Sequence, residues 1–200
     1  MPELIILFSL SSISFATTGL LAYERMQHVL PASWRRTFAE FVLLGISCAL
    51  LQRVETLAER VDFAVALGAL VSLADFDLRS GYVPNAALIP LACCSVVQFS
   101  IGEHPFAGIF GSLLVGGAGI ALHVIGDGTS FGLGDVKLLG IVGSILGAGD
   151  AFYLLGAAFV IGAVIALILI GSGRYARRDA LPFVPMVSLA LLWEIAEHAF

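Results

Sequence analysis

Eight apolar runs separated by short polar stretches make up most of the chain. The runs lie at residues 4–22, 38–51, 63–76, 84–99, 106–125, 136–149, 151–170 and 181–195. A membrane-spanning helix needs about 20 apolar residues, with a lower limit near 17. Five of the runs are shorter than that limit, so they need their polar flanks, or a place in the protein interior, to form part of a bundle. The pattern predicts an all-α, polytopic membrane helix bundle of about eight spans, with six or seven spans as alternatives.

Composition supports a membrane protein with a single integral domain over residues 1–200. The chain is 59% hydrophobic and 12% charged, with a mean hydropathy of +1.00. Soluble domains are about 25% charged, and one soluble core could not hide this much apolar surface. The longest polar stretch, 24–37, is too short to fold alone. We expect residues 4–22 to remain as a membrane helix, because the start of the chain lacks the basic residues of a cleaved signal peptide.

Basic residues predict the orientation of the bundle. If the N-terminus is outside, eight basic residues fall on the cytoplasmic side and two on the other side. The cytoplasmic set is Arg25, Arg35, Arg36, Arg79, Lys137, Arg174, Arg177 and Arg178; the outer set is Arg53 and Arg60. This distribution satisfies the positive-inside rule. It also places Asp77 and Asp135 at the cytoplasmic face.

Carboxylates near a bilayer are costly and often mark function. The candidates are Glu40, Asp62, Asp75, Asp77, Asp127, Asp135 and Asp150. Several have a structural interpretation: Asp62 and Asp150 as helix ends or turns, Asp127 as a turn residue between glycines, and Glu40 in a first helical turn. The cysteines and histidines show no metal-ligand spacing, so no metal or cofactor is predicted. No GxSxG motif is present.

Two polar segments contain Asp77 and Asp135. In 77–85, an apolar helix runs into Asp77, a basic turn follows, and Pro84 opens the next helix, where proline is well tolerated. In 131–139, Gly132 and Gly134 precede an apolar helix. These glycines let the backbone take unusual dihedrals and let another segment approach closely. Asp135 could simply be the N-cap of that helix.

Considered together, the two aspartates predict chemistry. Two carboxylates on different helices at one membrane face can share a proton if they meet, because each negative charge raises the pKa of the other group. Such a pair supplies an acid and a base from identical side chains and can activate water against a peptide carbonyl. A small transporter or channel subunit that binds cations or protons is the main alternative, since glycine-broken helices occur there too.

The two segments resemble the signatures of the type IV prepilin peptidase family. Residues 76–85 resemble its first signature, an Asp followed seven positions later by Pro and then Asn or Asp, and GLGDVKLLG at 132–140 resembles its GxGD signature. Presenilin-type proteases share GxGD, but the first segment fits the prepilin group better. The resemblance covers about 60–170, with the peptidase core predicted at 61–171 and N-terminal helices at 1–60.

The resemblance implies a function and roles for particular residues. Asp77 and Asp135 would be the catalytic pair, Gly132 and Gly134 would shape the loop, and Lys137 would be an accessory charge. The enzyme would remove the short basic leader from prepilins, pseudopilins or archaeal preflagellins at the cytoplasmic face of the inner membrane. The expected partners are these substrates and the lipid bilayer, with no nucleic acid.

One departure from the long bacterial members predicts a narrower activity. Those enzymes carry a cytoplasmic insert with paired CxxC motifs, which accompanies N-methylation of the new terminus. The corresponding region here, 24–37, has no cysteine. The chain therefore resembles a peptidase-only form. An inactive assembly protein of the same fold is a further alternative.

Overall fold

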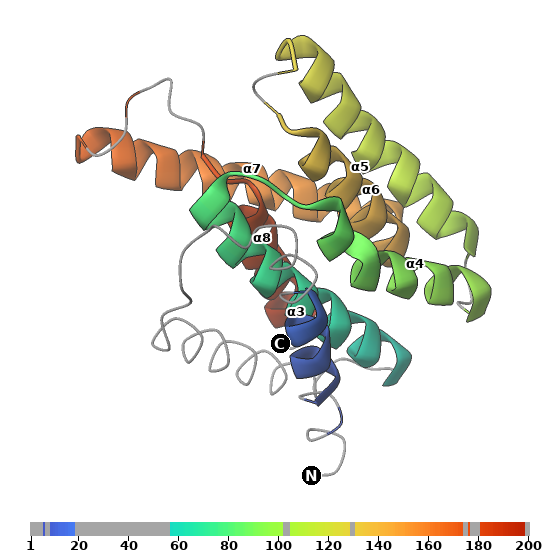
Figure 1. Cartoon of the computed structure of the whole chain (residues 1–200). Coiled ribbons are helices and arrows are strands. Elements are labelled where there is room, and N and C mark those ends of the chain that lie inside the picture. The colour runs from blue at the N-terminus through green and yellow to red at the C-terminus, as the bar shows by residue number, and fades with distance from the viewer. Residues whose placement is uncertain are drawn as a thin grey trace.

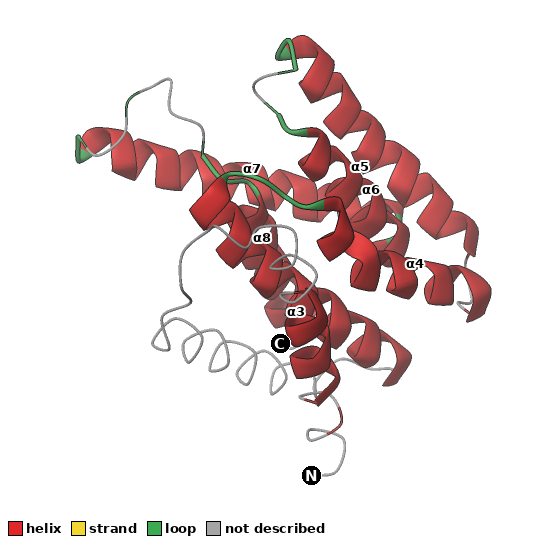
Figure 2. Cartoon of the chain, viewed as in Figure 1, coloured by secondary structure: helices red, strands yellow, loops and turns green. Residues whose placement is uncertain are grey.

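The structure, a computed structural model, describes residues 6, 9–18, 57–101, 105–128, 131–173, 176 and 181–198. Its elements are α3 (Leu57–Ser80), the short 3₁₀ helix η1 (Asn85–Leu88), α4 (Ile89–Ile101), α5 (Pro105–Ile125), α6 (Leu133–Leu146), α7 (Ala148–Gly171) and α8 (Val184–His198). Figure 1 labels the α-helices. Residues 9–18 are also helical. Figure 2 shows helices joined by loops, with no strand among the described residues. The predicted all-α class is confirmed.

The apolar runs and the helices agree closely in the C-terminal two thirds of the chain. The runs at 106–125 and 151–170 correspond to α5 and α7, and both helices are long and apolar enough to cross a membrane. The run at 38–51 and Glu40 lie outside the described residues. The count of eight spans stays a prediction.

Two boundary predictions were wrong. The break before α7 was expected at Gly149 and Asp150 but falls at Gly147, whose φ of 84° and ψ of 178° suit a residue without a side chain. Asp150 consequently lies in the first turn of α7. Asp62, expected at a helix end or turn, lies inside α3, because that helix begins at Leu57, well before the apolar run.

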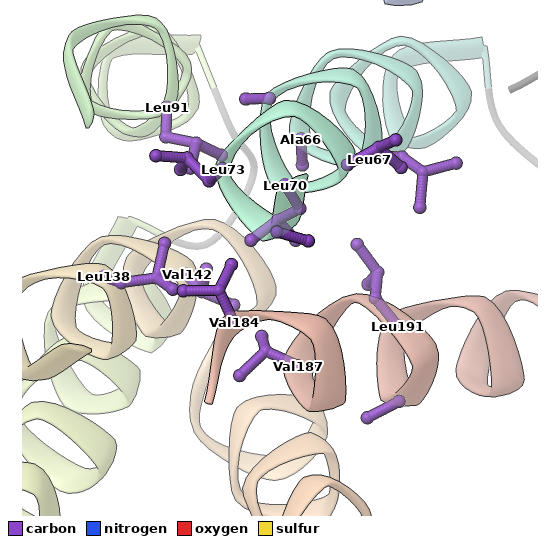
Figure 3. Close-up of a cluster of buried hydrophobic side chains, with 14 of the residues drawn as sticks. Ala66, Leu67, Leu70, Leu73, Leu91, Leu138, Val142, Val184, Val187 and Leu191 are labelled. Carbon is purple, nitrogen blue, oxygen red and sulfur yellow. The ribbon is translucent and has the colours of Figure 1, made fainter. Parts of the chain in front are cut away.

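A core shared by α3, α6 and α8 fixes the helix ends that carry the site. Leu70 of α3, Leu138 and Val142 of α6, and Val184 and Val187 of α8 belong to one buried cluster (Figure 3). Leu70, Leu138, Val184 and Val187 are fully buried. The first residue of α8 is therefore anchored between α3 and α6.

Glycines bring α5 and α6 into close antiparallel contact. A Cβ atom built on Gly108 would lie 2.5 Å from the carbonyl oxygen of Ser144, and one built on Gly143 would lie 2.5 Å from that of Gly111. Neither position has room for a side chain. Small residues here therefore allow close helix packing, and the contact fixes the start of α6, where Asp135 lies.

Candidate active site

Asp77 lies in the last turn of α3 and points into the protein, with 5% of its surface exposed. The helix ends because Gly81 takes a left-handed φ of 60°, and its N–H donates to the Asp77 carbonyl at 2.8 Å. The side-chain Oδ2 of Asp77 accepts a hydrogen bond of 3.0 Å from the backbone N–H of Val184, the first residue of α8. A buried carboxylate thus lies at the N-terminus of a helix, where negative charge is favoured.

Asp135 is the third residue of α6 and is partly buried. The helix is capped by Gly132, whose carbonyl accepts the Val136 N–H at 3.1 Å. The N-cap interpretation of Asp135 was therefore wrong: the chain turns into the helix three residues earlier. A backbone hydrogen bond from Gly132 reaches the Asp135 carboxyl, while its Oδ1 is buried with no hydrogen-bond partner among the described residues.

The two carboxyls are electrostatically coupled. Both lie just outside the apolar runs 63–76 and 136–149. Burial is the largest cause that raises the pKa of Asp135 to about 6, and the negative charge of Asp77 is the second. The hydrogen bond from Gly132 opposes this rise. Burial also raises the pKa of Asp77, and hydrogen bonds from the backbone of Val184 and Phe183 oppose that rise. Such a pair holds one proton more readily than two or none, as an acid–base pair must.

Contacts also join the two signature segments to each other. The Lys137 ammonium donates to the Asn85 side-chain oxygen at 2.9 Å. A Cβ atom on Gly134 would lie 3.0 Å from the Cβ of Val83, so α6 approaches this loop more closely than a larger residue would allow. Pro84 is buried at the N-cap of η1, with φ of −70°, as expected for a proline that opens a helix.

The signature glycines adopt backbone dihedrals that other residues also adopt, and their importance lies in the room that a missing side chain leaves. Gly132 has φ of −71° and ψ of 144°, which any residue adopts, and Gly134 lies in the first turn of α6. The expectation of unusual dihedrals at these two positions was therefore wrong. The expectation of a close approach is confirmed at Gly134, which Val83 contacts.

Two of the other described carboxylates, Asp75 and Asp127, have structural roles. Asp75 forms an ion pair with Arg79, one turn along α3. Asp127 adopts φ of 51° in a turn after α5, which confirms its predicted turn role. No group of three metal-ligating side chains occurs among the described residues.

The contribution of α8 to the site was not foreseen. Phe183 is the N-cap of α8, since its carbonyl accepts the N–H groups of Met186 and Val187 at 3.0 and 3.2 Å. Its ring packs edge-on against Phe131 beside the GxGD loop, with centroids 5.0 Å apart. Prolines at 182 and 185 were the available signal for a helix start. Nothing in their spacing connects that start with Asp77.

A groove of about 600 Å³ adjoins the contact between the segments. Its walls come from η1, α4, α5 and α6, and Asn85 and Lys137 both line it. Three serines supply further polar surface: Ser95, Ser112 and Ser144. The hydroxyls of Ser95 and Ser144 hydrogen-bond to each other across the groove wall.

The described part of the chain is helical, has two apolar helices of membrane length and holds two buried carboxyls near helix ends. The sequence model of the type IV leader peptidase family matches residues 64–167, just over half of the chain. The chain belongs to this family of membrane peptidases. Searches of curated proteins and of solved structures gave no match.

Proposed function

We propose that the chain is a membrane aspartic endopeptidase that removes the short basic leader from prepilins or pseudopilins, with Asp77 and Asp135 as its catalytic pair. The observation that supports this most strongly is the coupling of the two carboxyls, in which the charge of Asp77 raises the pKa of Asp135. Membership of the leader peptidase family favours this activity over the transporter alternative.

The proposed reaction needs only the pair and water. The ionised carboxylate takes a proton from water, and the resulting hydroxide attacks the scissile carbonyl carbon. The protonated carboxyl hydrogen-bonds to the carbonyl oxygen and gives it a proton as the tetrahedral intermediate forms. Collapse then breaks the C–N bond: the carboxyl that took up the water proton passes it to the leaving amine, and the other carboxylate takes back a proton from a hydroxyl of the intermediate as the C=O bond reforms. Both carboxyls thereby regain their starting protonation states.

The proposed active site faces the cytoplasm, and the proposed activity is cleavage alone. The eight-to-two distribution of basic residues supports an active site at the cytoplasmic face of the inner membrane in a multi-pass protein. The contact between Lys137 and Asn85 supports an accessory role for Lys137 in holding the two segments together. The absence of cysteine from residues 24–37, which lie outside the described part of the chain, supports cleavage without N-methylation.

The test is direct cleavage by the purified protein in liposomes. A recombinant prepilin and a pseudopilin, each with its basic leader, serve as substrates, and mass spectrometry locates the cut and weighs the new N-terminus. We expect a single cut at the junction between leader and apolar helix, with an unmodified terminus. Intact substrate after incubation with a folded, inserted protein would refute the activity. A methylated terminus, with S-adenosylmethionine supplied, would refute only the peptidase-only form.

A further inference from the structure

The start of α8 contributes to the catalytic pair although it lies beyond the family match at 64–167. The first turn of a helix has backbone N–H groups without intrahelical partners. In α8, Met186 donates to the Phe183 carbonyl, and Pro185 has no N–H. The Val184 N–H donates to Asp77. A side chain 107 positions earlier thus takes the place of a local cap.

This arrangement is asymmetric between the two aspartates. Asp77 receives hydrogen bonds from the backbone of both Val184 and Phe183, whereas Asp135 receives one from Gly132 and leaves Oδ1 buried without a partner among the described residues. Hydrogen bonds donated to a carboxylate favour its charged form. The Val184 side chain is fully buried in the core, so its N–H is held in place (Figure 3).

Other charged groups of the described residues leave this asymmetry intact. On α3, Arg79 pairs with Asp75. On α6, Lys137 bonds to Asn85. The first titratable side chain of α8 is Glu194, nearly three helical turns beyond Val184. On α5, the His123 ring bonds to the carbonyl of Phe131 rather than to either aspartate.

We propose that the first backbone N–H groups of α8 position Asp77 and keep it as the ionised member of the pair, so that Asp135 holds the proton. This assignment rests on the proposed peptidase function and gives each aspartate one role. Asp77 is the base that takes the proton from water, and Asp135 is the acid that donates to the scissile carbonyl. The start of α8 is then a positioning element of the active site.

Replacing Val184 by proline tests the hydrogen bond with little change to the helix. Proline removes the N–H and is well tolerated at the first helical position. Val184→Ala is the matched control, since it trims the same side chain but keeps the N–H. In Val184→Pro, the acid limb of the pH profile of kcat/KM for a leader-junction peptide should move up by about one pH unit relative to Val184→Ala. Identical profiles for the two variants, both correctly inserted, would overturn the proposal.

Infrared difference spectroscopy of the full-length protein gives a second test that needs neither the proline variant nor any cleavage. At pH 5, one of the protonated-carboxyl bands of the wild type should be lost in Asp135→Asn, and the same band should persist in Asp77→Asn. The reverse pattern, or loss of the band in both variants, would overturn the assignment. If no substrate is cleaved but the expected pattern appears, the proposed function fails while the assignment of the proton stands.

Discussion

The ammonium of Lys137 and the side-chain oxygen of Asn85 lie 2.9 Å apart and join the two segments that bear the catalytic candidates. Asn85 begins η1 just after Pro84, and Lys137 lies two residues beyond Asp135. The contact therefore links the helix that starts with the GxGD loop to the loop that follows Asp77.

Breaking this contact should slow cleavage without abolishing it. Because Lys137 is exposed, we expect Lys137→Gln and Asn85→Ala each to lower kcat/KM by about tenfold or less. The double variant should match the single ones, since the two side chains act through one bond. Asn85→Asp is the control: its carboxylate still accepts from Lys137 and should retain most activity. Losses that multiply in the double variant would show that the two residues act separately.

The catalytic pair can be separated from its neighbour Asp75. We expect Asp77→Asn and Asp135→Asn each to lower kcat by about a thousandfold or more, and the double variant to be no worse, because the pair acts as a unit. Asp75→Asn should keep substantial activity, since Asp75 bonds to Arg79 on another face of α3. Membrane insertion is checked for each variant. Loss of activity in Asp75→Asn together with full activity in Asp77→Asn would show that the wrong carboxylate was chosen.

Sequence reasoning predicted the helices better than their junctions. Long apolar runs predicted α5 and α7 within three residues of each end, because composition alone decides a long apolar helix. The break at Gly147 was missed, since several glycines lie nearby and only a positive φ distinguishes the one that turns. The two catalytic candidates came from local motifs and from a family resemblance. The hydrogen bond between Asp77 and Val184 is a contact between distant segments, which no local pattern encodes.

Alanine should destabilise the protein at one glycine of α5 and not at another, because only the first glycine is closely packed. A Cβ on Gly111 would lie 2.6 Å from the carbonyl carbon of Gly147, whereas one on Gly117 meets nothing within 4 Å. Gly111→Ala should therefore destabilise the protein by about 1–3 kcal/mol. Gly117→Ala, the matched control on the same helix, should be neutral or stabilise it by up to about 1 kcal/mol. Thermal unfolding in detergent measures both, and equal midpoints would contradict the observed packing.

The proposed orientation is open to a labelling test. Single cysteines at Ser80, Ser130 and Ser172, in a background without Cys48, Cys93 and Cys94, should resist an impermeant thiol reagent in intact cells, because the distribution of basic residues places these loops inside. Permeabilised cells provide the control and should show labelling at all three sites. Strong labelling of any of them in intact cells would overturn the orientation.

Stability should fall as pH rises through the range in which Asp135 ionises. The folded protein raises the pKa of Asp135 from 3.8 to about 6. A group whose pKa is higher in the folded state binds its proton more tightly there, so its contribution to stability is complete below the unfolded pKa and is lost as pH rises through the folded pKa. The midpoint of thermal unfolding in detergent should therefore decline between about pH 4 and pH 7. The raised pKa of Asp77 acts in the same direction.

Substitution of Asp135 tests its share of that decline. Asp135→Asn should lessen the slope and raise the unfolding midpoint at neutral pH, because a buried charge and its repulsion with Asp77 are both eliminated. Asp127→Asn is the control: this residue is exposed in a turn with φ of 51°, a conformation that asparagine accepts, and it should keep the wild-type slope. If Asp135→Asn declined with pH as steeply as the wild type, Asp135 could not be the group that titrates near pH 6. A gain in stability together with a loss of cleavage would show that the buried carboxyl is retained for catalysis at a cost to the fold.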